Sequence, residues 1–165
     1  MRTSPAVFAL ALVGLFGCDL LEPKIDQKLA EGLVESIITK EGLKPSAVTC
    51  PANQSAKKGH KFECTATIDG TDVHFALEVL DDNGTVSAEP RDHTLVVSKV
   101  EPEIKSDLLA AGHDVKSIDC HGDVWVAVKG ATVSCDVTDE AGTAYLWSAT
   151  FTGDSGEHEH SIAPK

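Results

Sequence analysis

Five cysteines and seven histidines are the side chains whose types and spacing could do chemistry. Cys50 and Cys64 lie 14 positions apart. Cys120 and Cys135 lie 15 apart, and Cys18 stands alone at the end of an apolar segment. The sequence has no G-x-S-x-G, H-E-x-x-H, P-loop or G-x-G-x-x-G motif, so the machinery of the common hydrolases and nucleotide enzymes is missing. We therefore expect no enzyme activity and no cofactor.

The C-terminal sequence Glu-His-Glu-His at residues 157–160 is the one cluster of metal-ligand types. Side chains at alternate positions of an extended segment point the same way, so His158 and His160 could share a metal ion. Polar chain ends of this kind are more often frayed. We expect residues 158–165 to form a flexible tail, and metal binding by the two histidines is the alternative.

Charge and composition exclude some classes of function. The chain of 165 residues has a formal net charge of −12, with 42% hydrophobic and 24% charged residues. These proportions are typical of a globular chain long enough for one domain or two small ones. An acidic surface repels nucleic acid and anionic lipid headgroups, so we expect no nucleic-acid partner.

Residues 1–17 have the layout of an export signal. One arginine precedes an apolar run over residues 6–16, which is shorter than the roughly 20 residues that span a bilayer. The run ends in Leu-Phe-Gly-Cys at Cys18, which resembles the bacterial lipobox. The resemblance implies cleavage before Cys18 and diacylglycerol on its sulfur. We expect an exported protein, anchored by this lipid to a bacterial membrane and facing the periplasm or cell exterior, with residues 18–24 as a tether.

If Cys18 carries lipid, four cysteines remain, and they allow three disulfide pairings. The sequence around them occurs twice, at an offset of 70 to 72 residues. A close pair within each copy is the economical choice, and export permits disulfides. We therefore predict the bonds Cys50–Cys64 and Cys120–Cys135. Zinc is the alternative, but zinc sites usually have shorter C-x₂₋₄-C spacings.

Hydrophobic periodicity predicts the elements that position these cysteines. Apolar residues recur at helical spacing over residues 25–40, and apolar and polar residues alternate over 61–68 and 71–80, which predicts a helix and two strands. In the second copy, Ser98 and Glu101 have capping-box spacing, which predicts a helix from about residue 99.

The predicted fold class is α+β. We expect two tandem modules over residues 25–90 and 95–157, each with one helix packed on a small antiparallel sheet and one internal disulfide. Each module is too small to be robust on its hydrophobic core alone, so the disulfide is needed for stability.

The cysteine and glycine pattern resembles a bacterial domain-of-unknown-function family, number 4333, which occurs singly and in tandem in secreted and lipid-anchored proteins. The family contributes structural motifs and no catalytic residues. The layout is also similar to that of the tandem β-lactamase inhibitor protein. The matching residues in the two copies are Val48, Cys50, Pro51, Gly59, Phe62, Cys64 and Gly70, then Ile118, Cys120, Gly130, Val133, Cys135 and Gly142.

Three functions remain open from the sequence. The first is a non-enzymatic envelope lipoprotein that acts as a binding or scaffold module, with a possible protein partner in the envelope. The second is an inhibitor or sensor of an exported enzyme, which would need Trp125 and Trp147 exposed as contact residues. The third is a metal-binding lipoprotein that uses His158 and His160.

Overall fold

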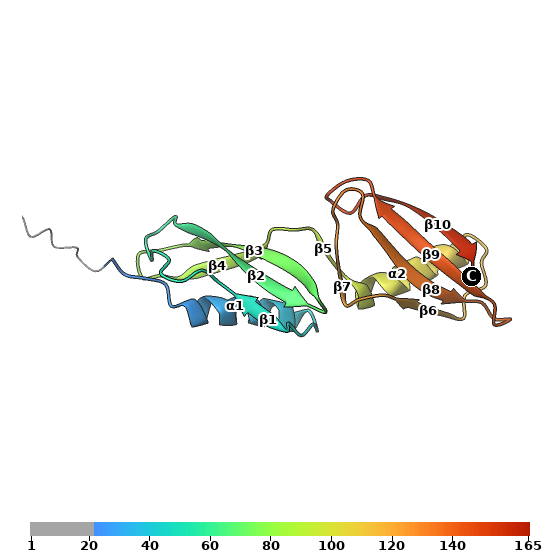
Figure 1. Ribbon diagram of the computed structural model, residues 1–165, viewed down its shortest axis with the longest axis horizontal. Coiled ribbons are helices and arrows are strands. Elements are labelled where there is room, and N and C mark those ends of the chain that lie inside the picture. Colours follow the sequence, from blue (N-terminus) through green and yellow to red (C-terminus); the bar gives the residue numbers. More distant parts are fainter. Residues whose placement is uncertain (1–21) are drawn as a thin grey trace, which may run out of the picture.

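The computed structural model describes residues 22–165, which form two modules placed end to end (Figure 1). The predicted leader, residues 1–17, and the predicted lipidation site Cys18 lie outside the described residues. No helix within the described range has the length and hydropathy needed to cross a membrane.

The first module is a helix packed on a four-stranded antiparallel sheet. Helix α1 (Gln27–Lys40) buries the apolar stripe that contains Ala30, Val34 and Ile38. Strands β2 and β3 form the predicted hairpin, with two further strands at the edges. The sheet order is β1-β2-β3-β4, with the bounds β1 (Ala47–Thr49), β2 (Lys61–Ile68), β3 (Thr71–Val79) and β4 (Val86–Pro90).

The second module repeats this plan. Helix α2 (Val97–Ala110) covers a sheet of order β6-β8-β9-β10, again antiparallel throughout. The strands are β6 (Ser117–Cys120), β8 (Thr132–Thr138), β9 (Ala144–Phe151) and β10 (His158–Pro164). The predicted α+β fold of two modules, each with a helix, a sheet and a disulfide, is confirmed.

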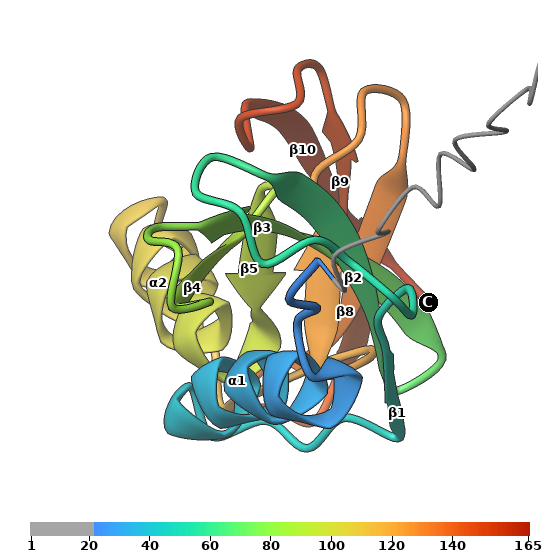
Figure 2. The ribbon, with the colours of Figure 1, turned by 90° about the vertical axis from the view of Figure 1, so that its left-hand side faces the viewer.

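A short two-stranded ribbon joins the modules. It pairs β5 (Thr94–Val96) with β7 (Val124–Val126). Val124 is 3% exposed and belongs to the hydrophobic core of the first module, although it follows the second helix in the chain. Lys99 of α2 also forms an ion pair with Glu41 at the end of α1. In the end-on view of Figure 2, α2 is offset from α1 and does not lie directly behind it, so the second module is turned relative to the first about the long axis.

The C-terminal segment differs from the prediction. Residues 158–165 were expected to be a flexible tail, but His158–Pro164 form β10 and pair with β9 along its whole length. β10 occupies the position of β4: His158 pairs with Phe151 as Val86 pairs with Val79. The tail prediction and the module boundary at residue 157 are wrong, because the backbone of β9 offers a free edge that polar residues can pair with equally well.

The start of α2 also differs from the prediction. The helix begins at Val97, two residues before the predicted start, and its N-cap residue Val96 makes no side-chain capping bond. Pro102 therefore lies inside the helix. The expected capping box is absent because the Glu101 carboxylate is used elsewhere: it accepts a hydrogen bond from the backbone N–H of Cys120 at 2.8 Å.

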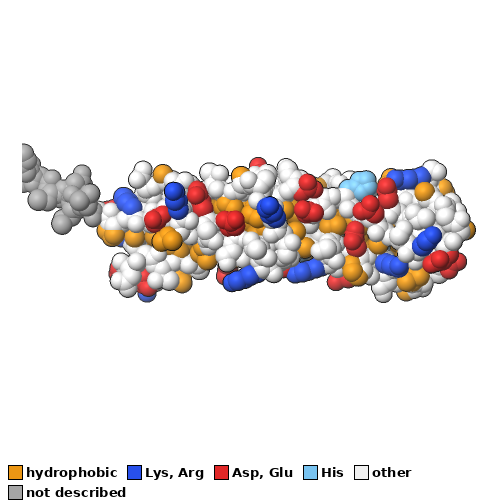
Figure 3. Space-filling model, turned by 90° about the horizontal axis from the view of Figure 1, so that it is seen from below, with side chains coloured by type: hydrophobic (Ala, Val, Ile, Leu, Met, Phe, Trp, Pro, Cys, Tyr) orange, Lys and Arg blue, Asp and Glu red, His pale blue; other side chains and the backbone are white. Residues whose placement is uncertain are grey.

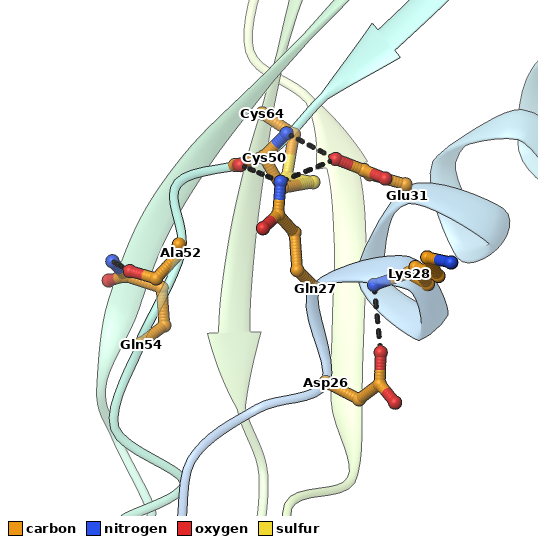
Figure 4. Close-up of a disulfide and its surroundings, with 8 residues drawn as sticks. All are labelled: Asp26, Gln27, Lys28, Glu31, Cys50, Ala52, Gln54 and Cys64. Carbon is orange, nitrogen blue, oxygen red and sulfur yellow. Dashed lines mark hydrogen bonds between the residues drawn. A yellow bond between two sulfur atoms is a disulfide. The ribbon is translucent and has the colours of Figure 1, made fainter.

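The same bond ties helix and disulfide in the first module. Glu31 Oε1 accepts hydrogen bonds from the N–H of Cys50 at 3.2 Å and from Gln27 Nε2 at 2.9 Å (Figure 4). Gln27 Nε2 also donates to the carbonyl oxygen of Cys50 at 2.9 Å. Glu31 and Glu101 occupy equivalent positions of the repeat, so each helix holds the first cysteine of its own module through a glutamate.

We predict that Glu31→Ala lowers the free energy of unfolding by about 1–3 kcal/mol, because it leaves the N–H of the buried Cys50 without its acceptor. Equilibrium unfolding in urea, followed by circular dichroism, measures this loss. Glu35→Ala is the matched control, since Glu35 lies on the exposed side of the same helix. Equal midpoints for the two variants would show that the Glu31 bond adds nothing.

We also predict that alternate backbone amides of residues 158–164 are protected from hydrogen exchange, as in any edge strand paired on one side. Exchange measured by NMR tests this. Truncation after Gly156 should remove the partner of β9 and shift tryptophan emission to longer wavelength, because the Trp147 ring contacts His158 and His160. Unprotected amides and an unchanged emission spectrum would contradict β10 and support a flexible tail over residues 158–165.

Candidate functional site

The four cysteines of the two modules are structural. The predicted disulfides Cys50–Cys64 and Cys120–Cys135 are both present, and all four residues are at most 7% exposed. A buried disulfide resists thiol exchange, because the attacking thiolate needs access to a sulfur. Each closes a loop of about 15 residues and stabilises its module by about 3 kcal/mol in the chain-entropy model.

The two tryptophans lie inside the second module. Trp125 is 6% and Trp147 is 4% exposed, and their rings stack with centroids 6.4 Å apart. The inhibitor hypothesis required these residues on the surface as contact residues. Their burial means that neither ring is available to bind a partner enzyme without rearrangement.

His158 and His160 lie side by side on β10, with ring centroids 5.9 Å apart. His160 stacks on Trp147 at 5.9 Å, and His158 meets the edges of Trp147 and Phe151. Within residues 22–165, no group of three or more His, Cys, Asp or Glu side chains is arranged to hold a metal ion. The two histidines are therefore brought together as predicted, but over an aromatic surface and without a third ligand.

These aromatic residues form the floor of a cavity of about 180 Å³ between α2 and the β9–β10 side of the sheet. Trp125, Trp147 and Phe151 line it, together with apolar residues of α2 such as Ile104 and Leu108. Five ionisable side chains line the same cavity: Glu103 and Asp107 of α2, His113 in the loop after α2, and His158 and His160 of β10.

The corresponding positions of the first module are all apolar. Offsets of 70 residues for the helix and loop, and 72 for the last strand, relate the two sets. Four of the apolar residues pack against the core of the first module. The five differences therefore place ionisable residues where the first module has apolar ones, four of which pack on its core. They are Leu33 to Glu103, Ile37 to Asp107, Leu43 to His113, Val86 to His158 and Ala88 to His160.

Sequence reasoning missed this cavity as a site. Glu103 and Asp107 read as ordinary polar positions of an amphipathic helix, and the histidines read as part of a tail. The signal that could have found it was the alignment of the two copies beyond Gly156, which places His158 opposite Val86. The residues aligned in this part of the two copies are not similar, so the sequence does not reveal the alignment. It follows from the register in which β10 pairs with β9.

The carboxylates with shifted pKa values lie away from the cavity and have structural roles. Partial burial raises the pKa of Asp92, but hydrogen bonds from the His74 side chain and N–H outweigh it, so this pKa lies below its ordinary value. A hydrogen bond from Lys165 is the largest cause that lowers the pKa of Asp136. That bond holds the last residue of the chain against β8.

Fold and cavity together define an α+β protein of two modules, each with one internal disulfide, whose second module has a cavity lined by both aromatic and ionisable residues. Residues 9–84 match the family described as "Domain of unknown function (DUF4333)", and this range covers most of the first module. The comparison with curated proteins found no match. No solved structure matched either, so the expected likeness to the β-lactamase inhibitor protein has no structural support.

We predict that Glu103→Leu combined with Asp107→Ile, the residues of the first module, raises the free energy of unfolding by about 1 kcal/mol, because the new aliphatic side chains can pack on the apolar lining of the cavity. The reciprocal pair, Leu33→Glu with Ile37→Asp, should destabilise the protein, because Ile37 packs on the core. Thermal unfolding measures both. Destabilisation by the first pair would mean that Glu103 and Asp107 are needed for the fold.

Proposed function

We propose that this protein is a non-enzymatic envelope lipoprotein whose second module binds a ligand in the cavity between α2 and β10. The observation that carries the proposal is the change of five lining positions from apolar to ionisable within an otherwise repeated scaffold. Exposed ionisable groups add little to packing, so their concentration around one cavity favours binding over stability.

We further propose that the second module is a divergent copy of the same domain of unknown function as the first. Four features support common origin: the same strand order, the same register of the last strand, one disulfide at the same place, and a glutamate bonded to the N–H of the first cysteine. After a duplication, one copy can keep its original residues while the residues that line the cavity of the other copy change.

The anchor is the second half of the proposal. The leader and lipobox-like sequence imply export, cleavage before Cys18 and diacylglycerol on its sulfur, which places the protein on the periplasmic or outer side of a bacterial membrane. The matched family range begins at residue 9 and therefore includes Cys18. Two buried disulfides fit an oxidising compartment.

We predict that the protein expressed in a bacterium fractionates with membranes and that its N-terminal peptide begins at Cys18 and carries acyl chains. Mass spectrometry of the detergent-extracted protein tests this directly. Cys18→Ser should release a soluble exported form, since several acyl chains together supply the stable anchoring. Cys120→Ala with Cys135→Ala is the control for loss of a cysteine, and it should remain in the membrane fraction. A protein that retains Met1 would contradict the anchor.

A further inference from the structure

The cavity of the second module has the size of a small organic molecule. Its volume of about 180 Å³ exceeds the roughly 150 Å³ of an engineered apolar cavity that admits benzene. One six-membered ring with a short side chain therefore fits. A peptide side chain could enter, but a whole peptide or a lipid could not be enclosed.

The floor of the cavity favours a flat apolar group. Trp125, Trp147 and His160 form a stacked row, with interplanar angles of 12° and 26° between neighbours. Phe151 and Ile104 complete this surface. Aromatic rings pack on such a surface by offset stacking or edge-to-face contact.

The charge around the cavity favours a cation. Glu103 and Asp107 are four positions apart on α2, so their side chains neighbour each other on one side of the helix. Within residues 22–165, neither carboxylate forms an ion pair, and none of the residues lining the cavity is Lys or Arg. Nearby Lys99 is already paired with Glu41.

We propose that this cavity binds a small organic ammonium ion that carries one ring, with the ring against the aromatic and aliphatic lining of the cavity and the ammonium group at Glu103 and Asp107. This inference rests on the proposed binding function and names its ligand class. Ammonium ions are attracted both to carboxylates and to the faces of aromatic rings, so the two parts of the cavity suit the two parts of such a ligand.

Titration of the purified full-length protein in detergent with phenethylammonium tests the proposal, followed by tryptophan fluorescence and calorimetry at pH 8. The neutral 2-phenylethanol and the anionic phenylacetate, which have closely similar shape, are the ligand controls. We expect the affinity to be highest for phenethylammonium, lower for 2-phenylethanol and lowest for phenylacetate. Glu103→Gln combined with Asp107→Asn should weaken phenethylammonium about tenfold, as expected for two partly exposed ion pairs, and leave 2-phenylethanol unchanged.

One further variant is the control for charge. Asp114→Asn removes a carboxylate that does not line the cavity, and it should leave the affinity for phenethylammonium unchanged. Thermal unfolding confirms that each variant is folded.

The outcomes separate this inference from the function on which it rests. Equal affinities for phenethylammonium and 2-phenylethanol, or no effect of the Glu103 and Asp107 variant, would overturn the ammonium ligand and keep the cavity as a binding site. Failure of all three probes to bind would overturn the inference and the cavity's binding role together. The lipid anchor at Cys18 is judged separately by mass spectrometry.

Discussion

The fold of each module depends on one local crosslink that is held from two sides. In each module the disulfide joins a cysteine directly after β1 or at the end of β6 to a cysteine in β2 or β8. A glutamate of the helix accepts a hydrogen bond from the backbone N–H of the first of these cysteines. The covalent bond restricts the unfolded chain, whereas the hydrogen bond fixes the helix to the sheet. A module with few aromatic residues needs both, because its aliphatic core is small.

The two modules share this crosslink but differ in the residues on the helix side that faces the last strand of the sheet. In the first module, Ile37, Val86 and Ala88 pack against the core, and Leu33 and Val86 line a hollow of about 160 Å³ whose other lining residues are mostly aliphatic. In the second module the same backbone positions carry carboxylates and imidazoles around a cavity floored by tryptophan. One scaffold thus has a mostly aliphatic lining between helix and sheet in one copy and a lining with ionisable and aromatic residues in the other.

The two modules are physically joined, since Val124 inserts into the core of the first module and Lys99 bonds Glu41 across the junction. Figure 1 shows the module with α1 at one end of the elongated molecule and the cavity-bearing module with α2 at the other. On the lower face, acidic and basic groups are interspersed along the whole length, with no large area of a single sign (Figure 3). The cavity of the second module adds two carboxylates and three histidines around one hollow.

The amino-acid sequence alone determined the class of fold, the helix over most of residues 25–40, the β2–β3 hairpin and both disulfides. These follow from local patterns: side-chain periodicity, turn residues and a repeated cysteine spacing. The tertiary structure decided which hydrogen-bonding partner each polar group has. The strand β10 exists because β9 has a free edge, and Glu101 bonds Cys120 because the two meet only in the folded module. The cavity combines residues of α2 and β10 that are more than 40 positions apart, and no local pattern records such a contact.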